Sequence, residues 1–308
     1  MGEKMHPFNL IVILGPTAAG KTRVGVQVAR SLGGEIISAD SRQVYQGMDI
    51  GTGKDLSEYG GIPYHLIDIK KPGEEFNVFE FQRAFVKSFD AIRSRGKLPI
   101  LVGGTGLYLE SILRGYHLPE VPENATLRKE LTASSLAELS ERLKQIKPDL
   151  HNTTDLMDRS RLIRALEIAE GTLRVPTPQV DLPELRPAVF GIKWDRQVLR
   201  RRITRRLQER VNGGMIVEVK SLYQAGLSYD QLDFYGLEYR YAALYLKGEL
   251  NRNDLFQKLN SAIHQFAKRQ ETWFRRMERK GVEIHWVEGA REPGDAILKI
   301  ISNSSQGS

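Results

Sequence analysis

The stretch Gly15-Pro16-Thr17-Ala18-Ala19-Gly20-Lys21-Thr22 matches the phosphate-binding pattern G-x-x-x-x-G-K-[ST] at every fixed position. It follows the apolar run Leu10–Leu14, which predicts a strand, and it opens a helical pattern over Lys21–Ser31. Glycine permits a tight turn whose N–H groups point inward, and the start of a helix adds positive potential. We therefore predict a phosphate-binding loop, with Lys21 at the outer phosphate and the Thr22 hydroxyl on Mg²⁺. An ordinary glycine-rich turn between a strand and a helix is the alternative.

Short apolar runs bounded by turn residues alternate with helical patterns through the first part of the chain. In Asn77–Arg95, phenylalanines and an isoleucine fall at helical spacing, and Asn77 is placed to cap the helix. Strands that alternate with helices indicate an α/β fold with a P-loop NTPase-like parallel sheet. The predicted strands are Leu10–Leu14, Glu35–Ser38, His65–Ile69, Leu98–Val102, Ala188–Trp194 and Val282–Val287.

The segment 117–187 has a different pattern. Its leucines and isoleucines fall at helical spacing, it shows no strand pattern, and prolines close it. We expect residues 1–116 to form the first part of an α/β core and 117–187 to form a helical insertion. Residues 188–308 are then expected to return to the core and to continue as basic C-terminal helices.

The composition limits the class of protein. The chain has 308 residues, 41% of them hydrophobic and 27% charged, which is typical of a globular protein. The absence of cysteine excludes a disulfide framework, a cysteine nucleophile and thiolate metal sites. The longest apolar run is far shorter than the roughly 20 residues that span a bilayer, and the N-terminal residues lack the layout of a signal peptide. We expect a soluble, cytoplasmic protein without a membrane partner.

The positive charge is concentrated in one part of the chain. The formal net charge is +7, and residues 195–280 alone hold 18 Lys/Arg against 10 Asp/Glu. The remainder therefore has slightly more acidic than basic residues. This asymmetry indicates a separate surface for an anionic partner.

Two aspartates follow predicted strands. Asp40 follows Ile36–Ala39, and the carboxyl ends of parallel strands share the edge of the phosphate-binding loop, so we expect Asp40 beside the bound phosphates. Its carboxylate can accept a proton or bind a metal, whereas capping the next helix is the alternative. Asp68 follows His65–Ile67 and is a weaker candidate for organising Mg²⁺, with a plain turn residue as the alternative.

Five stretches, read in order, give the chain a resemblance to the tRNA dimethylallyltransferases (tRNA isopentenyltransferases). They are GPTAAGKT (15–22), ISADSRQVYQGMDIGTGK (37–54), LVGGTGLYL (101–109), DRSRLIRALEI (158–168) and AKRQETWFR (267–275). The resemblance implies a P-loop α/β core with a helical insertion that grips the anticodon stem-loop. It also implies transfer of a dimethylallyl group from dimethylallyl diphosphate to N6 of the adenosine immediately 3′ of the tRNA anticodon, with release of diphosphate and with Mg²⁺ as cofactor.

The resemblance assigns roles to particular residues. Asp40 would accept the N6 proton, Thr105 would contact the diphosphate or the reacting region, and Arg206 would be the catalytic arginine. Arg206 lies in a helical pattern in which Arg202, Arg206 and Arg210 form one stripe. The diphosphate would bind to Gly15, Pro16, Thr17, Ala18, Ala19, Gly20, Lys21 and Thr22.

The resemblance also implies contacts with tRNA. The implied residues are Asp40, Ser41, Arg42, Gln43, Thr105, Arg128, Ser160, Arg161, Leu162, Ile163, Arg164, Tyr239, Arg240, Lys268, Arg269, Gln270 and Trp273. Arg161 and Arg164 could instead be surface charges of a helix, and Trp273 could be a core residue. The family often has a glycine where this chain has Glu238, and an acidic side chain beside RNA phosphate would repel it.

Two alternatives stay open at this point. An adenylate isopentenyltransferase would share the core but would have no evident use for the insertion or for the segment 267–275. A P-loop small-molecule kinase, or a nucleotide-dependent RNA-binding protein, explains only the loop and the charge, and it predicts that ATP or GTP is consumed. The sequence gives no basis for an oligomeric state, so a monomer is assumed.

Overall fold

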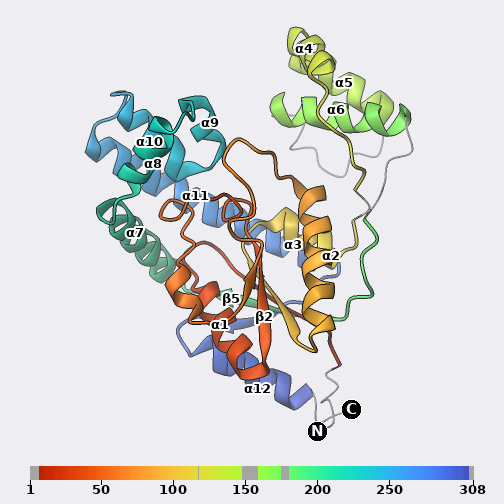
Figure 1. Ribbon diagram of the computed structural model, residues 1–308, viewed down its shortest axis with the longest axis vertical. Coiled ribbons are helices and arrows are strands. Elements are labelled where there is room, and N and C mark those ends of the chain that lie inside the picture. The colour runs from red at the N-terminus through yellow and green to blue at the C-terminus, as the bar shows by residue number, and fades with distance from the viewer. Residues whose placement is uncertain (1–6, 117, 148–158, 175–179, 305–308) are drawn as a thin grey trace. The chain divides into compact units, whose positions relative to one another are not determined.

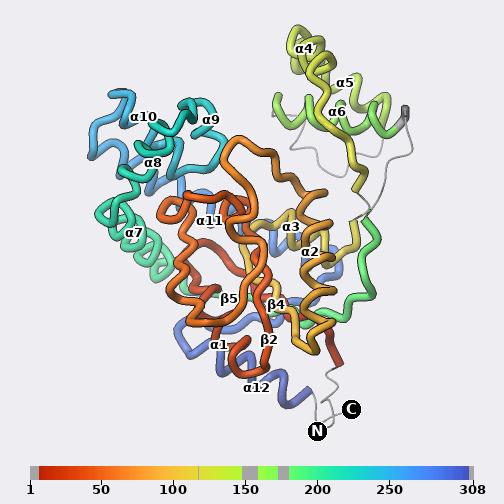
Figure 2. Tube along the Cα trace, viewed as in Figure 1, coloured from red at the N-terminus to blue at the C-terminus, as the bar shows by residue number. Residues whose placement is uncertain are grey.

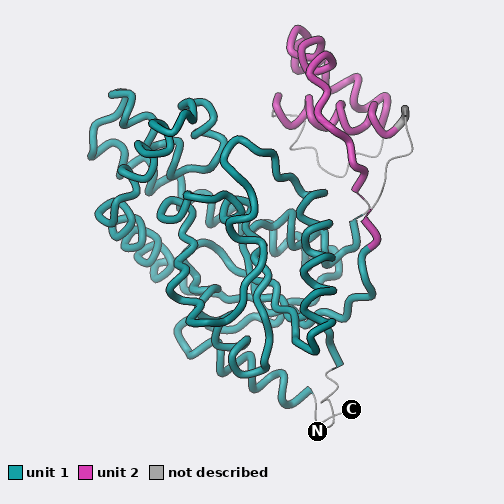
Figure 3. The backbone as a smooth tube through the Cα atoms, viewed as in Figure 1, with its two compact units in different colours: residues 1–116, 182–308 teal, residues 117–181 magenta. Residues whose placement is uncertain are grey.

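The chain forms two compact units (Figure 3). In this computed structural model, residues 7–116, 118–147, 159–174 and 180–304 are described. Unit 1 comprises residues 1–116 and 182–308, and unit 2 comprises residues 117–181. Within the described residues, each helix is too short or too polar to cross a membrane.

Unit 1 is built on a six-stranded sheet in the order β3-β2-β4-β1-β5-β6, and neighbouring strands run parallel. The strands are β1 (Leu10–Leu14), β2 (Gly34–Ala39), β3 (Tyr64–His65), β4 (Leu98–Gly103), β5 (Pro187–Lys193) and β6 (His285–Glu288). Every residue of β1, β2 and β4 is buried, as expected for a parallel sheet covered on both faces. The prediction of an α/β fold with a parallel sheet is confirmed.

The predicted strands His65–Ile69 and Val282–Val287 are wrong in their extent, and β6 begins only at His285. β3 ends at His65 because Leu66 and Asp68 both take positive φ, 64° and 56°, which extended strands do not contain. The backbone continues irregularly, and the N–H of Ile69 donates to the Val44 carbonyl at 2.9 Å. The apolar run therefore marked the buried Leu66 and Ile67 without marking a strand.

Helices cover both faces of this sheet (Figure 1). On one face Leu10, Val12 and Leu14 join a core shared with α2 and α3, whereas Ile11 and Ile13 face the opposite core with α1 and α12. Figure 2 shows α1 and α12 side by side on their face. The helices of unit 1 are α1 (Lys21–Leu32), the 3-10 helix η1 (Leu56–Tyr59), α2 (Val78–Ser94), α3 (Gly106–Leu113), α7 (Arg196–Asn212), α8 (Met215–Gln224), α9 (Tyr229–Phe234), α10 (Leu237–Leu246), α11 (Arg252–Arg279) and α12 (Pro293–Ser304).

Helix α2 follows its sequence pattern. The Asn77 side chain accepts the N–H of Glu80 at 3.0 Å, so the predicted cap is confirmed. Its apolar face, Phe81, Phe85 and Phe89, is buried in the core beneath it.

Helices α7 and α11 share a core with Ala18 of the phosphate-binding loop. Helices α8 to α10 lie on the same side of unit 1 (Figure 1). The apolar stripe Leu199, Ile203 and Leu207 of α7 is buried against Leu255 and Leu259 of α11. Burying this stripe fixes the rotation of α7 about its axis. The neighbouring stripe of arginines consequently has a defined direction.

In the part of unit 2 that the structure describes, the regular elements are the helices α4 (Ala125–Ala133), α5 (Leu136–Ile146) and α6 (Arg159–Arg174). Leucines of the three helices, among them Leu131, Leu143 and Leu166, form a small core of their own. The absence of strands from the described part of this unit agrees with the sequence pattern. Its helices therefore do not extend the sheet of unit 1.

Candidate active site

The phosphate-binding loop, Gly15–Thr22, joins β1 to α1. Gly20 has a φ of 87° and immediately precedes α1, so the backbone turns into the helix in a conformation that glycine adopts without strain. The Lys21 ammonium donates to the Pro16 carbonyl at 2.8 Å and so folds back onto its own loop. The free N–H groups at the start of α1 and the nearby ammonium together make this end of the helix an anion site.

The Lys21 ammonium is more acidic than an ordinary lysine. Burial lowers its pKa to about 8, the positive charge of Arg206 acts in the same direction, and the Asp40 carboxylate opposes both. The ammonium of Lys21 therefore experiences the charges of both Arg206 and Asp40. An anion bound between them would stabilise the charged ammonium.

The ends of β2 and β4 meet beside this loop. Ala39 pairs with Gly103 in the sheet, and the Thr105 N–H donates to the Ala39 carbonyl at 3.2 Å. The Thr105 hydroxyl in turn accepts the Ser41 N–H at 3.1 Å. The Asp40 carboxylate accepts the Arg42 N–H at 2.9 Å, which fixes it on the turn. Asp40 and Thr105 are thus brought together, as neighbouring parallel strands require.

Gln270 of α11 connects two loops of the site. Its side-chain oxygen accepts the Thr17 N–H at 2.8 Å, and its amide group donates to the Gly104 carbonyl at 2.9 Å. The side chain is buried and uses both ends within the protein. Gln270 therefore holds the phosphate-binding loop against the turn that carries Thr105, and the RNA contact implied for it stays a prediction.

Three arginines of α7 contact the loops at this edge of the sheet. Arg202 Nε donates to the Ala18 carbonyl of the phosphate-binding loop at 2.9 Å. Arg206 pairs with Asp55 at 2.8 Å, and Arg210 donates to the Gly51 carbonyl at 3.3 Å. The resemblance assigned a role to Arg206 alone. The three arginines follow one another at intervals of four residues, which was the sequence signal that they share one face of the helix.

Comparisons with known proteins address the family of this chain. The family model described as IPP transferase matches residues 43–277, and the model described as isopentenyl transferase matches residues 8–59. The chain is 65% identical to tRNA dimethylallyltransferase 1 of Geotalea uraniireducens, over 92% of this chain and 94% of the relative. The chain belongs to the tRNA dimethylallyltransferase family. The chain is also 63% identical to tRNA dimethylallyltransferase 2 of Syntrophotalea carbinolica, over 95% of this chain and 98% of the relative.

Solved structures agree with this family assignment. The full-length tRNA isopentenylpyrophosphate transferase from Bacillus halodurans is 35% identical, with a TM-score of 0.69 over 97% of this chain and 98% of that one. A eukaryotic dimethylallyltransferase acting on tRNA is 24% identical with a TM-score of 0.74, which shows that the fold is shared.

The remaining family-implied residues near β2 differ in exposure. Arg42 is partly exposed, and its guanidinium lies 4.8 Å from the centre of the Phe234 ring. Gln43 is buried, accepts the Ser38 hydroxyl at 2.9 Å and donates to the Gly53 carbonyl at 3.1 Å. Of these two, Arg42 is the side chain with surface available for RNA.

The family-implied residues on α10 and α11 also divide into buried and exposed side chains. Lys268 and Arg269 are exposed, whereas Trp273 is partly buried with the Arg276 guanidinium 4.0 Å from its ring centre. Tyr239 is buried and donates to Glu218 at 2.7 Å, and the exposed Arg240 pairs with Asp233 at 2.6 Å. Their contacts with RNA stay predictions.

In unit 2, two of the family-implied residues pair with one buried carboxylate. Arg128 and Arg164 both pair with Glu167, the former at 2.9 Å. Leu162 is fully buried in the core of the unit, and Ile163 is partly buried against it. Ser160 and Arg161 are exposed on α6. The exposed pair is the part of this segment that is accessible to a partner.

Two acidic residues that the sequence left open have partners within the protein. Asp68 pairs with the buried ammonium of Lys54, which favours the interpretation as a structural turn residue over a metal ligand. Glu238 replaces the family's glycine, and its Oε1 atom lies 3.2 Å from Nη1 of Arg210. The carboxylate of Glu238 therefore forms an ion pair with Arg210 within unit 1.

Proposed function

We propose that this chain transfers a dimethylallyl group from dimethylallyl diphosphate to N6 of the adenosine immediately 3′ of the anticodon in tRNAs, releasing diphosphate. The observation that carries the proposal is the convergence of Lys21, Arg206, Asp40 and Thr105 at one sheet edge in a member of this family. The curated relatives are named for the same transfer.

The chemistry requires most help at the leaving group. The exocyclic amine of adenine is a weak nucleophile, and breaking the C–O bond of the substrate places negative charge on the diphosphate. The loop amides, Lys21 and Arg206 would stabilise that charge. As the new C–N bond forms, the N6 proton passes to the Asp40 carboxylate. Thr105 would hold the Asp40 turn in place through the Ser41 N–H.

Mg²⁺ fits this site as a partner of the diphosphate. Thr22 lies in the first turn of α1, directly after Lys21, where its hydroxyl can serve as one ligand. Among the residues that the structure describes, no three acidic or histidine side chains form a cluster that could hold a metal by themselves. The ion would thus depend on phosphate oxygens for much of its coordination, as Mg²⁺ commonly does, and when bound it would neutralise charge on the leaving group.

The direct test incubates the protein with dimethylallyl diphosphate, Mg²⁺ and an unmodified anticodon stem-loop that contains adjacent adenosines. Mass spectrometry should show the gain of one dimethylallyl group on the RNA and none on a stem-loop whose target adenosine is replaced by uridine. No gain on the first RNA would contradict the proposal. Transfer to free AMP without transfer to RNA would favour the adenylate isopentenyltransferase alternative.

The role of Asp40 has its own test. Asp40→Asn keeps the size of the side chain but removes the proton acceptor, so we expect kcat to fall by about 10²–10⁴-fold. The KM for dimethylallyl diphosphate should stay nearly constant. Steady-state kinetics with the stem-loop measures both values. Weaker diphosphate binding at an unchanged kcat would contradict the assignment.

A further inference from the structure

The loop Met48–Lys54 follows β2 in the chain, and two of its carbonyl groups accept hydrogen bonds from arginines of α7. The Gly51 carbonyl accepts Arg210, and the Gly53 carbonyl accepts Arg206 at 3.4 Å. A Cβ atom at Gly53 would collide with both guanidinium groups. The position of Arg206 consequently depends on where this loop is held.

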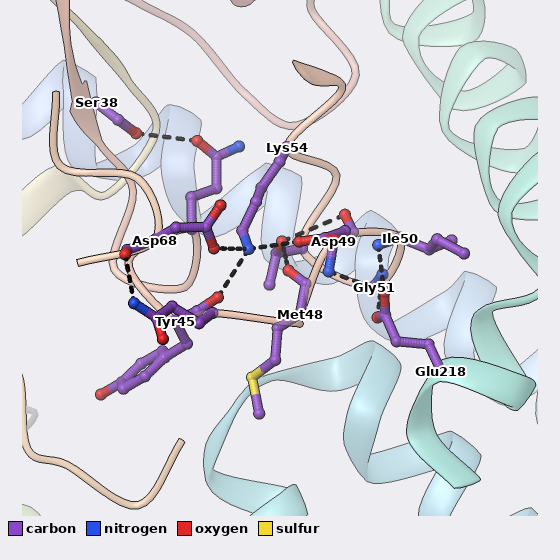
Figure 4. A network of polar contacts seen from close by, with 12 residues as sticks. Ser38, Tyr45, Met48, Asp49, Ile50, Gly51, Lys54, Asp68 and Glu218 are labelled. Carbon is purple, nitrogen blue, oxygen red and sulfur yellow. Dashed lines mark hydrogen bonds and ion pairs between the residues drawn. The ribbon is translucent and has the colours of Figure 1, made fainter. Parts of the chain in front are cut away.

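Glu218 of α8 fixes the first half of the loop (Figure 4). Its carboxylate accepts three consecutive backbone N–H groups, those of Asp49, Ile50 and Gly51, at 2.8, 2.7 and 3.0 Å. It also accepts the Tyr239 hydroxyl at 2.7 Å. With four donors on two oxygen atoms, the carboxylate has little freedom to move. Its hydrogen bonds therefore set the position of the loop relative to α8.

Lys54 fixes the end of the loop (Figure 4). Its side chain is fully buried, and its ammonium donates to the Tyr45 carbonyl at 2.7 Å, to Asp49 at 2.6 Å and to Asp68. All three N–H donors of the ammonium are thereby used. Burying such a charge is costly, and an apolar side chain of similar volume is often as stable, so stability alone does not account for it.

Asp55 extends this arrangement to Arg206. It follows Lys54 directly in the chain and pairs with the Arg206 guanidinium at 2.8 Å. Neither Lys54 nor Glu218 belongs to the phosphate-binding loop or to the Asp40 turn. Their hydrogen bonds to the loop give both residues a route to the arginines of α7.

We propose that Glu218 and Lys54 are positioning residues for Arg206, because they hold the loop whose Gly53 carbonyl and adjoining Asp55 orient the guanidinium toward the diphosphate. This inference rests on the proposed function, in which Arg206 stabilises the leaving group. Removing either anchor should therefore affect the reaction only while Arg206 is present.

The test is a double-mutant cycle of Glu218→Gln with Arg206→Ala. Glutamine keeps the size but points an amide donor at backbone N–H groups. In the wild-type background we expect kcat to fall by about 10- to 100-fold, with the KM for the stem-loop RNA unchanged. In the Arg206→Ala background the same change should alter kcat by less than about twofold. An equal loss in both backgrounds, or no loss in the wild type, would overturn the proposal.

A second variant and a control distinguish the loss of positioning from a general loss of stability. Asp68→Asn retains an acceptor for Lys54 and should give a smaller loss that also vanishes without Arg206. Glu35→Gln is the matched control, because Glu35 is a buried carboxylate at the opposite end of β2, paired with His65 at 2.8 Å and Arg95 at 2.7 Å. It should lower the melting temperature without lowering kcat.

Binding of inorganic diphosphate separates this proposal from the proposed function. Calorimetric titration should show weaker binding in Glu218→Gln than in the wild type, and no further weakening when Arg206 is already alanine. This cycle can be measured even if the wild-type protein transfers nothing to RNA, an outcome that would contradict the function alone. Equal weakening in both backgrounds would contradict the positioning role alone.

Discussion

The ammonium of Lys21 should give the enzyme a measurable pH dependence. Burial and the charge of Arg206 lower its pKa to about 8, so the free enzyme loses this positive charge as the pH rises through that value. Because kcat/KM reports ionisations of the free enzyme, kcat/KM for dimethylallyl diphosphate should fall tenfold per pH unit above about 8. Initial rates between about pH 6.5 and 9.5 at saturating RNA measure this decline of kcat/KM.

Two variants identify the group whose ionisation causes the decline of kcat/KM at high pH. Lys21→Arg keeps the charge at all of these pH values, so the decline should disappear even if the maximal rate is lower. Arg206→Ala removes a repelling charge and should move the midpoint to higher pH. A midpoint unchanged in both variants would show that another group titrates.

At the scale of single elements, α11 connects the site to the rest of unit 1. The buried carboxylate of Glu110 on α3 accepts Arg276 at 2.9 Å and Lys280 at 3.1 Å, both at the end of α11. Burial alone would raise the pKa of Glu110, but hydrogen bonds from Tyr116, Arg276 and Lys280 lower it to about 2. The ionised side chain of Glu110 therefore links α3 to the C-terminal end of α11.

Glu110→Gln should accordingly destabilise the protein at neutral pH. The folded pKa lies below the unfolded value, so the stabilisation is present above about pH 4.5 and is lost as the pH falls toward 2. We expect the free energy of unfolding to drop by about 2 kcal/mol at pH 7. The difference from wild type should shrink at pH 3.5. Urea denaturation at both pH values measures it, and a constant difference would argue against an ionised Glu110.

The elements themselves were largely predictable because their signals are local. The short apolar run Leu10–Leu14 and the helical spacing of the phenylalanines of α2 are signals contained in a few residues. The run His65–Ile69 misled because burial and apolar character do not report the positive φ of Leu66 and Asp68. Strand length at a sheet edge depends on backbone conformation that the apolar pattern does not encode.

At the scale of the whole molecule, the contacts that assemble the site join distant parts of the chain. Gln270 binds the Thr17 N–H across 253 residues, and Glu218 binds the Ile50 N–H across 168 residues. The phosphate-binding motif predicted Lys21, the strand pattern placed Asp40, and the resemblance added Arg206. No spacing within one segment could predict the long-range partners. Packing of α8 and α11 decides which faces meet, and that information is not local.

Binding of the whole tRNA is expected to depend on basic residues of both units. Exposed basic residues implied in RNA contact occur in both units, Arg161 on α6 and Arg269 on α11. Each phosphate contact releases counterions, so the logarithm of affinity falls linearly with the logarithm of salt concentration. If both units contact phosphates, Arg161→Ala and Arg269→Ala should each reduce that slope by about 1.

Arg205→Ala is the matched control for these variants. Arg205 lies on α7, is 83% exposed and pairs with Glu209 at 2.9 Å, so its loss should leave the salt slope unchanged. Fluorescence anisotropy of a labelled anticodon stem-loop between 50 and 300 mM salt, roughly the range in which such slopes are resolved, provides the measurement. A slope changed by Arg269→Ala but not by Arg161→Ala would restrict RNA contact at these positions to unit 1, and the helical insertion would then need a different role.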